Sequence, residues 1–323
     1  MTDPFTQDFA GFTQDQLRPA IEMVAKRRRS GLLLAVAIAA VLFVVFALTV
    51  YIFLSPYRQM MGDHNISYWP LLFLAPGSLA MIGFSLIYIL TLRHAVKEFR
   101  ETLVTRIAAF IDPALVHENK HPLSDGEIDS GLLFVDQGEA VPGQDRFRGR
   151  AGAATVDICD IQLQPGKNSV TGLPLLTGLF FRARFERPFR SFAMILPAHT
   201  AASLSTLESK AGAGPLVRLD EPDNGWQFVA ASADPSFIGD ILDPAINARL
   251  RELRGRNIRL HLSLRGDTLY AAMLTASDRK ELPGVFEGFD FGNCRDFCRD
   301  ARLCMDIARE VGGKTTVWRN ADA

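Results

Sequence analysis

An uncharged apolar run over residues 31–54 constrains the fold of this 323-residue chain more than any other feature. About 20 apolar helical residues cross a hydrocarbon core of about 30 Å, so the run is long enough to span a membrane. A buried helix of a soluble protein keeps a polar stripe along one side, and this run has none. The sequence therefore predicts a transmembrane helix here.

A second uncharged run follows at residues 69–92, after a short loop, and contains Pro76, Gly77 and Ser78. Proline removes one backbone hydrogen bond and bends a helix. A membrane tolerates this bend when a neighbouring helix or a serine satisfies the freed carbonyl group. We therefore expect a kinked second span, which forms a two-helix transmembrane hairpin with the first.

Lysine and arginine residues flank the two runs unequally. Four stand at residues 26–29 before the first run and three at residues 93–100 after the second, whereas the loop at residues 55–68 has only Arg58. Because basic residues concentrate on the cytoplasmic side of a membrane, both termini are predicted to face the cytoplasm. We expect a multi-pass protein of the cell inner (plasma) membrane. Its apolar run is too long for a cleavable signal peptide.

The remaining sequence divides into three parts. Residues 1–30 are predicted to form a cytoplasmic segment, with an amphipathic helix over residues 14–28 whose basic side chains lie near the inner leaflet. Residues 93–146 combine a helical stalk, which continues the second span, with a polar linker rich in turn residues. Residues 147–323 are expected to form the cytoplasmic domain.

Apolar and polar residues alternate in several segments of this domain, which is the pattern of half-buried strands. Strands are expected at residues 154–164, 179–185, 192–196, 216–219 and 227–231, the second and third forming a hairpin, and at 257–264 and 268–274 around a tight turn. Helical spacing predicts a helix over 234–254, interrupted at Asp243-Pro244, and a C-terminal helix over 293–311. Without βαβ alternation, the fold class is α+β with a mainly antiparallel sheet.

Composition argues against several classes of function. The formal net charge is −1, whereas nucleic-acid-binding proteins usually carry a basic excess, so no nucleic-acid partner is expected. Four cysteines are too few for a disulfide framework and fit a reducing compartment. The sequence has no phosphate-binding loop, dinucleotide fingerprint or nucleophile elbow, and we expect no cofactor.

One segment matches the H-E-x-x-H motif, through His117, Glu118 and His121. On a helix, this spacing puts two histidines on one face to bind zinc, and the glutamate activates a water molecule. Here Pro122 follows the second histidine directly and the flanking residues are polar. We expect a solvated loop without metal, and keep a membrane-associated zinc metallohydrolase as the alternative function.

Three of the four cysteines, Cys294, Cys298 and Cys304, stand on the predicted C-terminal helix. Structural zinc sites normally combine four ligands from two segments. A free cysteine packs as a small apolar residue. These cysteines are therefore predicted to belong to the core of the domain.

Phenylalanines and arginines are interleaved around the predicted strand at residues 179–185. Alternation buries Phe181 and Phe185 and exposes Arg182 and Arg184 on the opposite face. In a domain tethered near an anionic leaflet, exposed arginines of this kind attract acidic lipid. Arg182 and Arg184 are therefore the candidate residues for binding lipid or a partner.

Three groups of short motifs carry a family resemblance. In order within residues 90–275, they are Gly178-Leu179-Phe180 with Phe185 and Phe189, Leu219-Asp220-Glu221-Pro222 with Phe228 and Asp234, and Ile241-Leu242-Asp243-Pro244 with Leu250. Together with the paired apolar runs before them, they resemble the bacterial domain-of-unknown-function 3137 (DUF3137) family of membrane-anchored proteins. The resemblance implies no catalytic residue, because the family has no established activity, and its pattern calls for no histidine at positions 117 and 121.

The function that these observations favour is binding rather than catalysis. We expect a membrane-anchored cytoplasmic module that is not an enzyme and that binds a protein partner or the lipid bilayer at the inner leaflet. A transporter subunit would need polar residues within the spans, and the two apolar runs contain no charged side chain.

Overall fold

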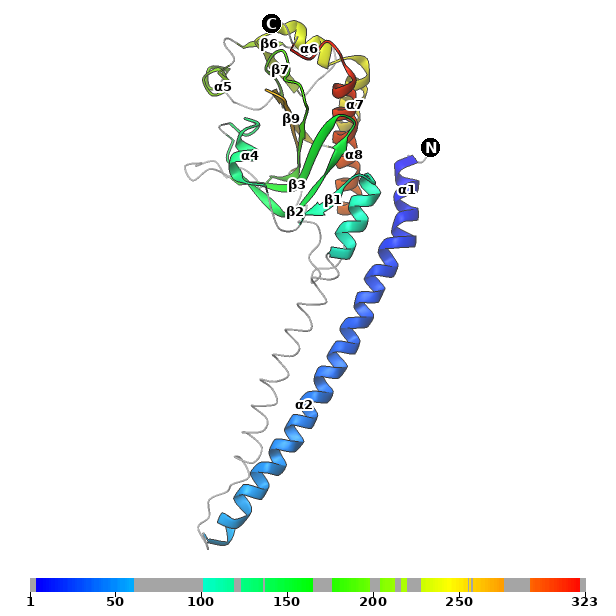
Figure 1. Ribbon diagram of the computed structural model, residues 1–323, viewed down its shortest axis with the longest axis vertical. Helices are drawn as coiled ribbons and strands as arrows, with labels where there is room; N and C mark the ends of the chain where they lie inside the picture. Colours follow the sequence, from blue (N-terminus) through cyan, green and yellow to red (C-terminus); the bar gives the residue numbers. More distant parts are fainter. Residues whose placement is uncertain are drawn as a thin grey trace. The chain divides into compact units, whose positions relative to one another are not determined.

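Figure 1 shows the computed structural model of the chain. The structure describes residues 4–60, 101–118, 123–135, 137–164, 176–197, 204–212, 216–219, 228–254, 256, 258–275 and 291–319. The chain divides into two compact units. One consists of Met1–Phe9 with Val104–Ala323, and the other of Ala10–Leu103.

Residues 4–60 are helical. Helices α1 (Pro4–Phe12) and α2 (Arg18–Met60) are joined by a π-helical segment, η1 (Thr13–Leu17). Within α2, Arg29–Thr49 is long and apolar enough to cross a membrane, and it is the one such helix in the described part of the chain. The second predicted span, residues 69–92, lies outside the described residues.

The domain contains a nine-stranded sheet in the order β1-β2-β3-β4-β9-β8-β5-β7-β6, and the pairings between its strands are antiparallel. The strands are β1 (Val116–Glu118), β2 (Glu139–Ala151), β3 (Ala154–Gln164), β4 (Leu176–Arg184), β5 (Ala193–Pro197), β6 (Val217–Leu219), β7 (Phe228–Ser232), β8 (Arg259–Arg265) and β9 (Thr268–Thr275). The predicted α+β class with a mainly antiparallel sheet is confirmed.

The hairpin of β8 and β9 forms at the centre of the sheet as predicted. Arg265 pairs with Thr268 across the turn, and Gly266 adopts a φ of 60°. Glycine accepts this left-handed conformation without steric cost, so it closes a tight turn between two alternating strands.

The C-terminal helix α8 (Phe291–Gly313) covers one face of the sheet, as Figure 1 shows. Its Phe297 ring lies 5.7 Å from the ring of Phe147 on β2. Helices α6 (Pro235–Ile241) and α7 (Pro244–Arg254) are separated at Asp243-Pro244, as the sequence predicts. The carboxylate of Asp243 accepts a hydrogen bond from the amide of Ile246 at 2.9 Å, which caps the start of α7.

The opposite face is covered by residues that the sequence placed in a polar linker. Helix α4 (Asp125–Asp129) lies there (Figure 1), and Leu123, Ile128 and Leu133 are buried against Phe180 of β4. The linker prediction was wrong for this segment. Leu123, Ile128 and Leu133 are five residues apart, which is neither helical nor strand spacing, so periodicity could not reveal them.

Five of the described elements were not predicted, namely helices α1 and α4, strands β1 and β2, and helix α5 (Leu204–Ala211). Strand β2 contains Pro142 and Gly143, which argue against a strand in the sequence, and the register shifts between Pro142 and Arg146 accommodate them as a bulge. The expected hairpin of β4 with β5 is also wrong. Strand β5 pairs with β7 and β8 instead.

Gly178 provides a test of the central pairing between β4 and β9. A Cβ atom at this position would lie 1.9 Å from the carbonyl oxygen of Met273, so the two strands would have to separate. We predict that Gly178→Ala lowers the free energy of unfolding by about 1–3 kcal/mol or more.

The four cysteines of the chain are buried, so their reaction with a thiol reagent during heating in detergent reports unfolding of the domain. Gly239→Ala on α6 is the control, because a Cβ there meets no atom within 4 Å and alanine favours a helix. Equal stability of the Gly178 variant and the wild type would contradict the β4–β9 pairing.

Candidate functional site: an arginine face on the sheet

Antiparallel pairing brings arginines from three strands to one face of the sheet. Residues directly opposite each other point to the same face. One row joins Arg150, Thr155, Arg184, Thr268 and Arg265, and the next joins Arg148, Asp157, Arg182 and Tyr270. We call the following set the arginine face: Arg146, Arg148, Arg150, Arg182, Arg184 and Arg265.

The arginine face is opposite to the face that α8 covers. Phe147, which contacts α8, is adjacent in sequence to Arg146 and Arg148. Neighbouring residues of a strand point to opposite faces. The arginines therefore share the face on which α4 lies, and Arg265 donates a hydrogen bond from Nη1 to the carbonyl oxygen of Ser130, directly after α4, at 3.0 Å.

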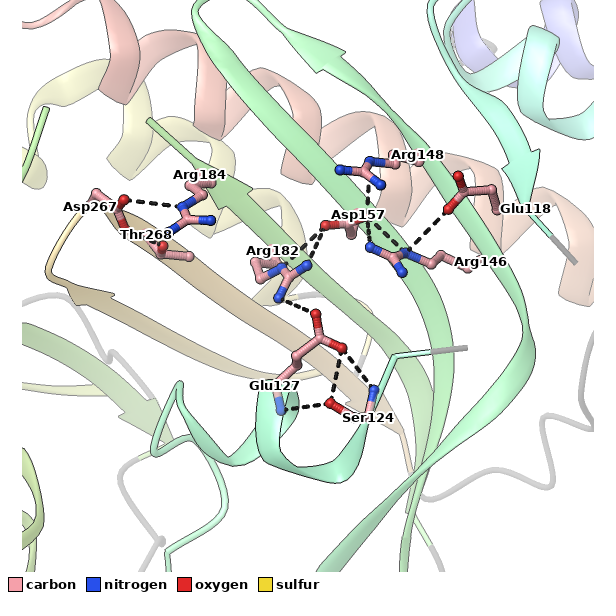
Figure 2. Close-up of polar contacts among 10 residues, drawn as sticks. All are labelled: Glu118, Ser124, Glu127, Arg146, Arg148, Asp157, Arg182, Arg184, Asp267 and Thr268. Carbon is pink, nitrogen blue, oxygen red and sulfur yellow. Dashed lines mark hydrogen bonds and ion pairs between the residues drawn. The ribbon is translucent and has the colours of Figure 1, made fainter. Parts of the chain in front are cut away.

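Asp157 is the centre of this face (Figure 2). Its Oδ1 accepts hydrogen bonds from Arg146 Nε at 2.8 Å and Nη2 at 2.6 Å. Its Oδ2 accepts hydrogen bonds from Arg182 Nε at 3.2 Å and Nη2 at 2.6 Å. The Asp157 side chain is only 5% exposed. Two guanidinium groups thus hold one buried carboxylate through paired charge-assisted bonds, which fix both the position and the orientation of the groups.

Glu127 of α4 supplies a second carboxylate. Arg182 Nη1 donates to Glu127 Oε1 at 2.8 Å, and Oε2 accepts from the amide and the hydroxyl of Ser124 at 2.9 and 3.0 Å (Figure 2). Burial raises the pKa of Glu127, but the bonds from Ser124 and Arg182 outweigh it and lower the pKa to about 2. Ser124 and Glu127 form a capping box, so one side chain both starts α4 and attaches it to the sheet.

The outer part of the arginine face is exposed. The side chain of Arg184 is 72% exposed and that of Arg148 is 51% exposed, and Arg150 is also exposed. Arg184 Nε donates to Asp267 Oδ2 at 3.1 Å, but an exposed pair of this kind contributes little to stability. The face therefore has a buried inner part held by carboxylates and an accessible outer part.

The structure separates the two arginines that the sequence had grouped. Arg184 is exposed, as expected. The side chain of Arg182 is only 19% exposed and is bound by Asp157 and Glu127, so its assignment to a solvent face was wrong. Phe180 is buried on this same face. Strand alternation distinguishes two faces, but it does not show that a distant segment covers the second one.

The H-E-x-x-H segment differs from the expected loop where the structure describes it. His117 and Glu118 lie on β1. The side chain of His117 is only 5% exposed, and its Nε2 lies 2.9 Å from Asp145 Oδ1. His121 lies outside the described residues. Among the described residues, no group of three or more His, Cys, Asp or Glu side chains is arranged to hold a metal ion.

The cysteines pack in the core, which confirms the prediction. Cys294, Cys298 and Cys304 are buried on α8, and Cys159 is buried on β3. Burial raises the pKa of the Cys159, Cys298 and Cys304 thiols well above the ordinary value. Buried thiols of this kind are inert at neutral pH, because the thiolate is the reactive form.

Most of the arginine face was not predicted. Arginines alternate along β4, and this pattern led to the prediction of Arg182 and Arg184. The same alternation of arginines at positions 146, 148 and 150 on β2 was not used in the prediction. Ser124 and Glu127 also have the spacing of a capping box, which would have predicted the start of α4. The central role of Asp157 had no local signal, because its partners come from two other strands.

Comparison with known proteins identifies one family. Residues 175–312 match the family described as protein of unknown function (DUF3137), and the predicted resemblance is thereby confirmed over this range. No curated protein and no solved structure matches the chain. The matched range contains Arg182, Arg184 and Arg265 of the arginine face. Asp157 and the arginines of β2 precede it.

The pKa of Glu127 leads to a test of the attachment of α4. Because its pKa is lowered from 4.5 to about 2 in the folded chain, Glu127 contributes stability that is fully present above pH 4.5 and is lost as the pH falls toward 2. We predict that the difference in melting temperature between wild type and Glu127→Gln shrinks across this window.

Circular dichroism during heating at pH 6 and at pH 3 measures this difference. Asp125→Asn, on the same helix, controls for loss of a carboxylate near the helix start. The pKa values of Asp234, Asp243 and Asp267 are also lowered, but these groups are present in both proteins and cancel. A difference that is the same at both pH values would contradict the role given to Glu127.

Proposed function

We propose that this chain, whose residues 175–312 match the DUF3137 family, is a membrane-anchored cytoplasmic module that binds a protein partner or the inner leaflet and is not an enzyme. The observation that carries the proposal is the combination, in one chain, of an apolar helix long enough to cross a membrane with an arginine face on a folded sheet domain.

The flanks of the apolar helix support a cytoplasmic N-terminus. Four basic residues stand at positions 26–29, at the start of Arg29–Thr49. Such clusters remain on the cytoplasmic side when a helix inserts. The residues before position 26 are therefore assigned to the cytoplasm.

Contacts of the first residues support the same side for the domain. The ring of Phe5 lies against the guanidinium groups of Arg299 and Arg302 on α8, at 5.2 and 5.1 Å. Arg299 Nη2 also donates to Thr6 Oγ1 at 3.2 Å. The ring of Phe9 is 5.7 Å from that of Phe110. Residues before the apolar helix thus pack on residues that follow it.

These contacts have a consequence for the number of membrane crossings. A chain that crosses at Arg29–Thr49 and keeps Phe5 and Thr6 against α8 must cross back before Val104. The uncharged run at residues 69–92 has the length and composition for this second crossing. The proposed arrangement is therefore a multi-pass protein of the inner membrane with both termini in the cytoplasm.

The chemistry of the described side chains favours binding over catalysis. Asp157 and Glu127 are engaged with arginines, and His117 is paired with Asp145. A zinc metallohydrolase would need His117 and Glu118 on a helix, whereas both lie on a strand. Carboxylates and histidines of these types can act as catalysts in other proteins, but here they form ion pairs and hydrogen bonds within the fold.

Labelling of single cysteines tests the topology. The four native cysteines are buried, so a new exposed cysteine is labelled selectively by a membrane-impermeant maleimide. In intact cells we expect labelling of Gly62→Cys, in the connecting loop, and no labelling of Ala321→Cys until the membrane is permeabilised. Labelling of Ala321→Cys in intact cells would place the domain outside and contradict the proposal.

A further inference from the structure

The outer part of the arginine face has the geometry of a site for phosphate groups. Arg150 and Arg184 stand on either side of Thr155 in one row of the sheet, and Arg148 follows in the next row. Adjacent strands lie about 4.8 Å apart, so Arg150 and Arg184 have backbones about 10 Å apart. Thr155, an exposed residue with a short side chain, lies between them.

The inner part of the face keeps these arginines in place. Asp157 connects β2, β3 and β4 through Arg146 and Arg182, so the strands that carry Arg148, Arg150 and Arg184 have a fixed register. Guanidinium groups on a rigid sheet lose less conformational freedom on binding than groups on a mobile loop. Glu127 of α4 and Asp157 bind Arg182. Arg148 and Arg184 also lie near carboxylates, 3.9 Å from Asp157 Oδ1 and 3.1 Å from Asp267 Oδ2, but their side chains are 51% and 72% exposed and remain accessible to an anion.

We infer that Arg148, Arg150 and Arg184 bind the phosphates of anionic lipid head groups in the inner leaflet. This inference rests on the proposed cytoplasmic, membrane-anchored function. Guanidinium groups bind phosphate oxygens through paired hydrogen bonds. A domain tethered to the membrane meets lipid phosphates at a high effective concentration, so a few arginines suffice for binding. An acidic protein has complementary charge as well, but the proposed membrane anchor brings lipid phosphates, not an acidic protein, close to the domain.

Binding to vesicles tests the inference with the full chain. The protein is reconstituted in phosphatidylcholine nanodiscs and mixed with sucrose-loaded vesicles of either phosphatidylcholine or phosphatidylcholine with phosphatidylglycerol, which are then sedimented. We expect wild type to sediment only with the anionic vesicles, and added salt to release it. Arg150→Gln with Arg184→Gln should weaken this binding by roughly tenfold or more.

The control variant removes the same charge elsewhere. Lys210→Gln with Arg295→Gln changes one exposed residue on α5 and one partly exposed residue on α8, and should sediment like wild type. Arg150→Lys with Arg184→Lys keeps the charge and should retain most of the binding. Thiol labelling of the buried cysteines shows that each variant is folded.

Three results would overturn the inference. The first is wild type that does not sediment with anionic vesicles at low salt. The second is an equal loss of vesicle binding in the Arg150→Gln, Arg184→Gln variant and in the control variant. The third is wild type that is retained by immobilised poly-glutamate but not by anionic vesicles. The last result would assign the face to an acidic protein. None of them depends on the topology, because the vesicles reach the nanodisc from solution, so the proposed anchoring would stand or fall on the maleimide labelling alone.

Discussion

The ion pairs of Asp157 with Arg146 and Arg182 are the interaction on which the rest of the arginine face depends. All three side chains are largely removed from water, and removing one partner of such a group leaves a buried charge without compensation, at a cost of about 3–5 kcal/mol. The three residues come from β2, β4 and β3, so their ion pairs favour one register of these strands. A slip by one residue would move the charges to the opposite face, where α8 packs on apolar side chains.

Two kinds of arginine result from this arrangement. Those near Asp157 serve the fold, because the carboxylates of Asp157 and Glu127 already satisfy them. Arg150 and Arg184 lie one row further out, at the ends of β2 and β4, and Arg148 lies directly opposite Asp157 with half of its side chain exposed. The same residue type thus holds the sheet together and provides a surface for anions, and the exposure of the side chain separates the two roles.

Sequence reasoning predicted the features that depend on neighbours along the chain. The apolar helix, the β8–β9 hairpin and the C-terminal helix have strong periodicity, and each is present. The burial of Arg182 and His117 could not be predicted in this way, because it depends on α4 and on Asp145, which come from other parts of the chain. Strand β2 was not predicted because Pro142 and Gly143 argue against a strand, whereas the structure accommodates both residues in a bulge.

A double-mutant cycle between Asp157 and Arg182 tests the central role of Asp157 most directly. The free energy of unfolding of the full chain in detergent is measured through thiol labelling for wild type, Asp157→Asn, Arg182→Gln and the double variant. The structure predicts that each single change destabilises the domain and that the double change costs less than their sum, with a coupling energy of about 1–3 kcal/mol. Additive effects, within about 0.5 kcal/mol, would show that the two groups do not interact and would contradict the account.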